Sequence, residues 1–169
     1  MEKPKVKDAV LREAAGEGMD EFLKVFVDAI MDSIGGELNS ETMAELNVDQ
    51  ITLLAYNIVH EEVMDGGFVQ LIYNGYGGFI YLNPFAKALK VWGIDDMARV
   101  IRKTGKLYRA HRAEIERDYS DEEFMALFEK FPAFDEFDDL FVENEEYWTE
   151  CVARYVDEHI DNFVTIEDN

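Results

Sequence analysis

The segment His60-Glu61-Glu62 brings together side chains of the types that zinc proteases use. It resembles the start of their HExxH helix, in which a second histidine, four residues after the first, completes the metal-binding pair. That position holds Met64. With three histidines and one cysteine in the whole chain, zinc would depend on carboxylates for most of its ligands. We therefore expect no metal site and no cofactor.

Other chemistry finds no better support in the sequence. Apolar residues interrupt the acidic segment 135–146, so it lacks the alternating ligands of an EF-hand calcium loop. Cys151 lies on an apolar helix face, where a structural cysteine is expected. The glycines at 66–67 and 75–78 match neither the Walker nor the Rossmann phosphate-binding pattern. The sequence thus predicts a protein that is not an enzyme. One alternative stays open, an enzyme with a pocket lined by His60, Gln70, Tyr73 and Asn74.

Acidic residues dominate the chain, with 37 Asp and Glu against 16 Lys and Arg, for a net charge of -21. Eighteen of these acids, but only Lys130 and Arg154, fall between Asp118 and Asn169. Nucleic acids and anionic membranes are bound through basic residues, so we expect neither to be a direct partner. Self-repulsion of this size opposes a compact fold. We therefore expect the acidic end to bind a partner of opposite charge.

The elements that must position these residues are predicted to be helices. Apolar residues recur at intervals of three and four, and the 48% hydrophobic content is too high for a disordered acidic tail. Asn47, Asn83 and Ser120 are expected helix caps. The expected helices cover about 22–33, 48–64, 68–73, 84–92, 95–117, 121–131 and 144–163. We predict one all-α, multi-helix domain over residues 1–169, without strand pairs.

Location and internal charge balance follow from the same sequence. One cysteine, no secretory signal and no apolar run of membrane-spanning length predict a cytoplasmic protein.

The expected helix 95–117 carries a basic stripe made of Arg99, Arg102, Lys103, Lys106 and Arg109. One interpretation is that the acidic end is a solvated face that this stripe partly neutralises. Crowded carboxylates should also raise some of their own pKa values, so stability should fall as pH rises.

The segment DGGFVQLIYNGYGG contains a GGF-x-Q-x-x-YN pattern, carried by Gly66, Gly67, Phe68, Gln70, Tyr73 and Asn74. Together with FDEFDDLFVENEEYW and YVDEH nearer the end, it resembles a bacterial family of acidic DNA mimic proteins that share a domain of unknown function. The resemblance covers about residues 57–169, which the N-terminal helices precede. It implies a largely helical protein that dimerises and whose carboxylates imitate DNA phosphates toward a DNA-binding regulator.

The charge density of the acidic end agrees with that implication. Thirteen acids and one lysine fall between Asp118 and Glu150. On a helix that rises about 1.5 Å per residue, this is one net charge every roughly 4 Å, close to the phosphate spacing of about 3.4 Å along a DNA strand. A homodimer could use an apolar patch made of Phe79, Ile80, Tyr81 and Phe85.

We therefore predict a DNA mimic whose partner is a basic DNA-binding protein, either a transcription regulator or a nuclease. The alternatives are an immunity-type inhibitor of a basic nuclease toxin and a soluble acidic domain with no decoy role. The glycine motif is expected to be structural. The candidate partner-binding acids are Asp121, Glu122, Glu123, Asp135, Glu136, Asp138, Asp139, Glu143, Glu145, Glu146 and Glu150.

Overall fold

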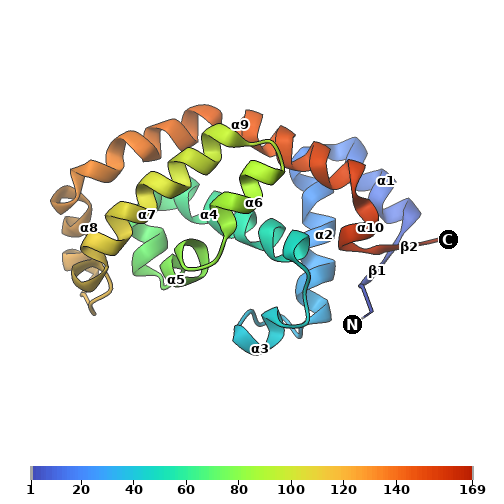
Figure 1. The fold of residues 1–169 in the computed structure, drawn as a ribbon, viewed down its shortest axis with the longest axis horizontal. Helices are drawn as coiled ribbons and strands as arrows, with labels where there is room; N and C mark the ends of the chain where they lie inside the picture. Colours follow the sequence, from blue (N-terminus) through green and yellow to red (C-terminus); the bar gives the residue numbers. More distant parts are fainter. Residues whose placement is uncertain (1, 169) are drawn as a thin grey trace. The chain divides into compact units, whose positions relative to one another are not determined.

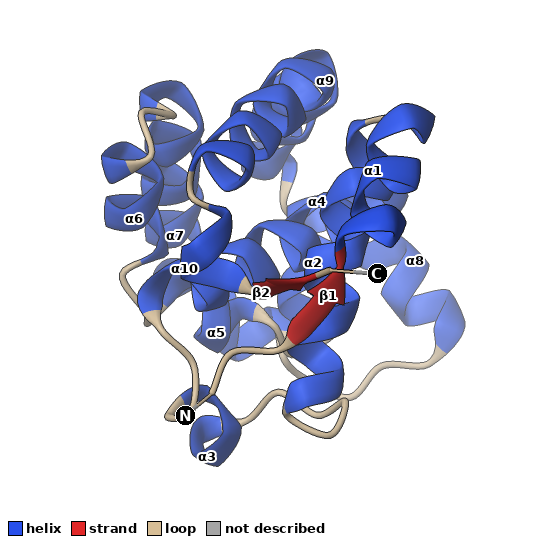
Figure 2. Ribbon diagram, turned by 90° about the vertical axis from the view of Figure 1, so that its right-hand side faces the viewer, coloured by secondary structure: helices blue, strands red, loops and turns tan. Residues whose placement is uncertain are grey.

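The computed structural model describes residues 2–168, and helices make up most of them (Figures 1 and 2). The predicted all-α class is confirmed. The helices are α1 (Asp8–Glu17), α2 (Met19–Ser33), α3 (Ser40–Met43), α4 (Val48–Tyr73), α5 (Gly77–Tyr81), α6 (Phe85–Val91), α7 (Asp95–Ile115), α8 (Asp121–Lys130), α9 (Asp135–Glu158) and α10 (Ile160–Phe163), with a 3₁₀ turn at Pro132–Phe134.

Three sequence-based expectations about these elements are wrong. Asn83 does not cap α6: the helix starts after Pro84 without a side-chain cap, and Asn83 Nδ2 donates to the Phe79 carbonyl at 2.9 Å. Strands β1 (Lys5–Lys7) and β2 (Thr165–Glu167) form a short parallel pair, which local periodicity cannot detect because the partners come from opposite ends of the chain. Helix α9 begins at Asp135 and not near Asn144. Its extra turns carry Phe137 and Phe141 on a buried face, a helical spacing that the many acids between them obscured.

Contacts group the chain into two compact units. The first contains the residues up to Leu54 and those from Tyr147 onward, and the second is Ala55–Glu146. The boundary between the units falls inside α4 and α9. Charge is also divided: the first unit has eighteen acids against six basic residues, and the second has nineteen against ten.

In the first unit, the start of α4 is held by reciprocal capping. Asn47 and Gln50 each accept the other's backbone N–H, at 3.0 and 2.8 Å, which confirms Asn47 as a cap. The Gln50 side-chain amide then donates to the carbonyl of Phe163 at 2.9 Å. Phe163 packs edge-on against Phe26 of α2, with ring centroids 6.1 Å apart. Buried aromatic contacts therefore stabilise this unit around the cap.

In the second unit, Phe68 of α4, Phe134 and Phe141 are fully buried and form part of the core. Helices α6 and α7 pack closely against each other. Ser120 caps α8 as predicted: its hydroxyl accepts the Glu123 N–H, and Glu123 Oε1 accepts the Ser120 N–H. These bonds hold the pKa of Glu123 below its usual value.

The apolar patch predicted for self-association is not a surface feature. Ile80, Tyr81 and Phe85 are buried in the second unit. The Tyr81 hydroxyl donates to Thr104 Oγ1 at 2.8 Å, and its ring stacks on Tyr108 with centroids 5.0 Å apart. Phe79 is half-buried. It lies with Ile80 and Tyr81 on α5, which was not predicted as a helix, and Phe85 lies on α6. Among residues 2–168, none of the helices combines the length and apolar composition that a bilayer crossing requires.

Candidate protein-binding surface

Helix α4 is broken at the glycine motif. Gly67 has φ 83° and ψ -178°, outside the helical region, while the residues on both sides continue the helix. Only glycine adopts this backbone conformation without strain. The predicted helix end at Gly66-Gly67 and the predicted new helix from Phe68 to Tyr73 are both confirmed by this break.

A carboxylate from α9 caps the helix that restarts after this break. The Phe68 N–H donates to Asp138 Oδ1 at 2.8 Å. A Cβ atom at position 67 would lie 2.6 Å from Asp138 Oδ2, so the glycine also makes room for the carboxylate. Burial raises the pKa of Asp138 to about 6; the Phe68 N–H opposes this shift, and the nearby charges of Asp135 and Asp139 add to it.

The motif's two amide side chains bridge the break within α4. Gln70 Nε2 donates to Glu62 Oε2 and Asp65 Oδ2, both at 2.9 Å. Asn74 Nδ2 donates to the same Glu62 oxygen at 3.0 Å. Gly66 lies so close to Gln70 that a Cβ there would overlap the side-chain amide. The amides thus join the part of α4 after Gly67 to the part before it.

Tyr73, the remaining motif residue, reaches toward α8. Its hydroxyl donates to the Tyr119 carbonyl at 3.3 Å, and its ring meets Phe124 edge-on with centroids 4.4 Å apart. The motif therefore contacts both acidic helices of the second unit, α8 through Tyr73 and α9 through Phe68. The motif is recognisable in the sequence, but its partners Glu62 and Tyr119 are not, because no local pattern marks them.

These contacts also bear on the alternative of an enzyme pocket at the motif. The amide donors of Gln70 and Asn74 are engaged by carboxylates of their own helix. His60 Nε2 lies 2.7 Å from Glu145 Oε1. The polar side chains proposed for a pocket are therefore hydrogen-bonded within the fold, Gln70 and Asn74 to their own helix and His60 to α9.

The candidate acids fall into three groups by their surroundings. Asp138 and Glu145 are partly buried and bind α4. Glu123 belongs to the α8 cap, and Glu150, in the first unit, pairs with Arg154 at 2.9 Å. The remaining acids are exposed and, within residues 2–168, engage in no ion pair. They are Asp121, Glu122, Asp135, Glu136, Asp139, Glu143 and Glu146.

Four of these exposed acids follow one face of α9, namely Asp135, Asp139, Glu143 and Glu146, which we call the outward row. Their spacing of four, four and three residues keeps them on one side of a helix. Exposed apolar side chains accompany them: Leu140 is 37% and Val142 55% exposed. Mixed apolar and charged side chains at a surface suit contact with a protein, because apolar area is buried alongside the charges.

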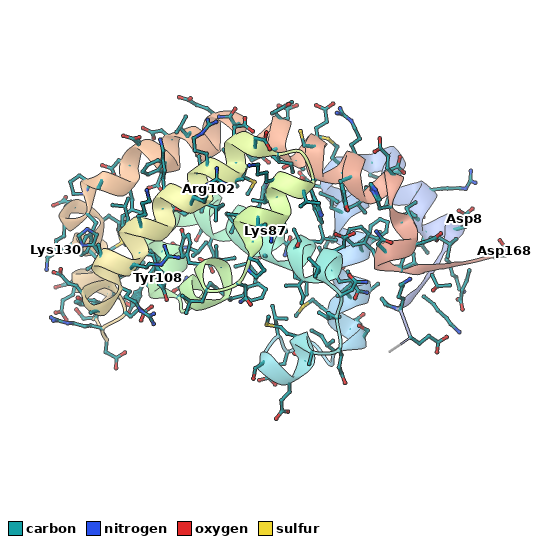
Figure 3. The ribbon with its side chains drawn as sticks, in the orientation of Figure 1. Asp8, Lys87, Arg102, Tyr108, Lys130 and Asp168 are labelled. Atoms are coloured by element: carbon teal, nitrogen blue, oxygen red, sulfur yellow. The ribbon has the colours of Figure 1, made fainter. Side chains whose placement is uncertain are left out.

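Within Ala55–Glu146, the basic stripe forms no ion pair with the outward row. All five of its side chains on α7 are exposed, and within Ala55–Glu146 the only ion pairs are His60–Glu145 and Arg112–Glu116. Lys87 lies on α6, which packs beside α7, the helix that carries Arg102 (Figure 3). The basic stripe and the outward row thus lie on different helices, α7 and α9.

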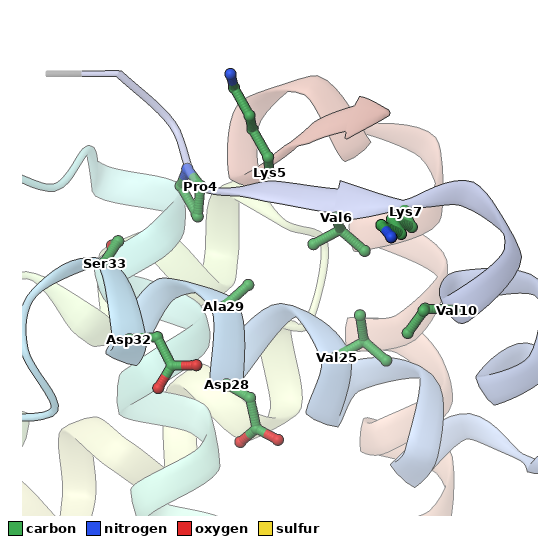
Figure 4. A pocket seen from close by; sticks show the side chains of 10 residues that line it. All are labelled: Pro4, Lys5, Val6, Lys7, Val10, Val25, Asp28, Ala29, Asp32 and Ser33. Atoms are coloured by element: carbon green, nitrogen blue, oxygen red, sulfur yellow. The ribbon is translucent and has the colours of Figure 1, made fainter. Parts of the chain in front are cut away.

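The first unit contains an open pocket of about 610 Å³ between β1 and α2 (Figure 4). Its apolar lining includes Val6, Val25 and Ala29, and Lys7 and Asp32 stand at its margins. None of the candidate acids and none of the motif residues line it. The pocket is therefore separate from the surface that the sequence indicated.

Comparison with known proteins agrees with the resemblance seen in the motif. The family described as DMP19-like protein matches residues 44–159. Over 131 residues, which are 77% of this chain and 79% of the relative, the chain is 33% identical to the DNA mimic protein DMP19 of Neisseria meningitidis serogroup B. The family match includes the glycine motif, α8 and the outward row.

Proposed function

Because the chain belongs to the DMP19-like family, we propose that it is a non-enzymatic DNA mimic that binds a basic DNA-binding protein. In this proposal the outward row binds to the surface that the partner uses to bind DNA. The partner is a transcription regulator. The observation that carries this proposal is the row itself. Its four exposed carboxylates lie on one helix face, and none of them forms an ion pair within the second unit.

Electrostatics and surface composition both support a protein partner. Unpaired exposed acids attract Lys and Arg side chains and speed their association, and the attraction weakens with salt. Leu140 and Val142 add apolar area that a small cation would not need. In this proposal the glycine motif makes no contact with the partner and serves only to hold α8 and α9.

Capture from a bacterial lysate tests the proposal. The immobilised chain should retain a basic DNA-binding protein that added duplex DNA releases. A variant with Asp135→Asn, Asp139→Asn, Glu143→Gln and Glu146→Gln should lose this protein. The control variant, Glu13→Gln, Glu17→Gln, Glu37→Gln and Glu45→Gln, removes the same charge from exposed acids of the first unit and should retain it.

The identity of the retained protein then decides between the two partner classes. A transcription regulator supports the proposal in full, whereas a nuclease supports the alternative of an immunity-type inhibitor. Retention that duplex DNA does not reverse would contradict DNA mimicry in either form. Light scattering of the purified chain tests the homodimer that the family resemblance implies.

A further inference from the structure

The carboxylates of α9 within the second unit face two directions. Asp138 and Glu145, seven residues apart, lie on the face that meets α4, where they bind the Phe68 N–H at 2.8 Å and His60 Nε2 at 2.7 Å. The outward row lies on the exposed side of the same helix. One helix therefore carries carboxylates that bind the fold and carboxylates that face solvent.

We infer that Asp138 and Glu145 are positioning residues. Their hydrogen bonds to α4 fix the outward row in place for its partner, and their own charges do not contact the partner. This inference rests on the proposed function and assigns different roles to acids that look equivalent in the sequence. It predicts that neutralising Asp138 or Glu145 weakens partner binding less than neutralising an exposed acid one or two residues away.

The surroundings of Asp138 show why its hydrogen-bond acceptor matters more than its charge. The carboxylate sits at the start of a helical segment, where unpaired N–H groups favour an acceptor. Within residues 2–168 it forms no ion pair. The groups that face it are the Phe68 N–H of α4, the charges of Asp135 and Asp139 on α9, and, at longer range, the neutral Tyr81 hydroxyl of α5.

This environment makes the charged form costly. Burial and two like charges raise the pKa of Asp138, and the single N–H bond offsets only part of that effect. Asparagine offers the same acceptor oxygen without the charge, so Asp138→Asn should keep the cap. Glu145→Gln likewise keeps an acceptor within reach of His60.

Amide measurements on the purified chain test the positioning role without any partner. In the wild-type protein, the Phe68 amide proton shift should titrate with a midpoint near pH 6. Hydrogen exchange at Phe68, taken relative to Ile72 in the same helical segment, should rise by up to about tenfold in Asp138→Ala, the upper end for losing a typical hydrogen bond. Asp138→Asn and the neighbouring control Asp139→Asn should leave this ratio near its wild-type value.

Binding of a decalysine peptide at low ionic strength shows which carboxylates a basic partner can contact from solution. The pair Asp139→Asn with Glu143→Gln should weaken peptide binding by about threefold per charge, the value for exposed ion pairs. The pair Asp138→Asn with Glu145→Gln removes equal charge and should weaken it less than twofold. Equal weakening by both pairs, or a Phe68 exchange ratio in Asp138→Ala that stays at the wild-type value, would overturn the inference. Neither result would decide whether a DNA-binding protein is the partner.

Discussion

The glycine motif and the outward row are the two regions through which this chain resembles DNA mimics, and they have opposite physical characters. The motif is buried at Gly67 and Phe68 and half-buried at Gly66, Gln70 and Tyr73, and its polar side chains are hydrogen-bonded within the fold. The row is exposed and is not ion-paired within the second unit. The motif thus stabilises the fold, and the row remains available for a partner. Changes to the motif should therefore alter stability, and changes to the row should alter binding.

The largest effect on stability should come from Phe68→Ala. The ring is fully buried and packs edge-on against Phe141, with centroids 6.3 Å apart. Removing it leaves a cavity, which should lower the free energy of unfolding by about 3–5 kcal/mol. Urea unfolding followed by circular dichroism measures this. A loss below about 1 kcal/mol would show that the motif is not part of the core.

Gly67→Ala should have the next largest effect, about 2–4 kcal/mol, because it adds backbone strain and a collision with Asp138. Gly75→Ala is the matched control: Gly75 also has a positive φ, of 91°, but a Cβ there would meet no atom within 4 Å. It should cost about 1–2 kcal/mol, from strain alone. Equal losses in the two variants, measured by urea unfolding, would exclude a role for the Asp138 contact.

Asp138 should also make stability depend on pH. Its pKa is raised in the folded protein from 3.8 to about 6, so between these values the folded state binds more protons than the unfolded state. Stability should therefore fall as pH rises from 4 to 7, by about 1 kcal/mol after allowance for partial exposure. Thermal unfolding should show a weaker fall in Asp138→Asn. An unchanged pH profile in that variant would assign the effect to other groups.

The smallest effect on stability should come from the outward row. Asp139→Asn combined with Glu143→Gln removes two exposed charges that have no ion pair. Urea unfolding should detect a change within about 0.5 kcal/mol, or a slight gain from reduced repulsion. A loss as large as that of Gly67→Ala would mean that the row stabilises the fold, and the contrast with the motif would disappear.

Much of the fold was predictable because it is encoded locally. Apolar spacing indicated α2, α7 and α8, and Asn47 and Ser120 capped helices where their side chains suggested. The direction of individual acids was not predictable: Asp138 and Asp139 are neighbours of one residue type, and only packing against α4 turns one inward. The β1–β2 pair and the start of α9 were missed because one depends on distant residues and the other was masked by its acidic composition.

Displacement of a fluorescent DNA duplex from the captured DNA-binding protein tests the central claim most directly. The wild-type chain should displace the duplex, and the first-unit variant with four neutralised acids should do so equally well. The outward-row variant, with the same net charge, should need at least a tenfold higher concentration, if each lost contact contributes at least about 0.4 kcal/mol. Equal displacement by the two variants, or no displacement by the wild-type chain, would contradict the claim that the outward row imitates DNA.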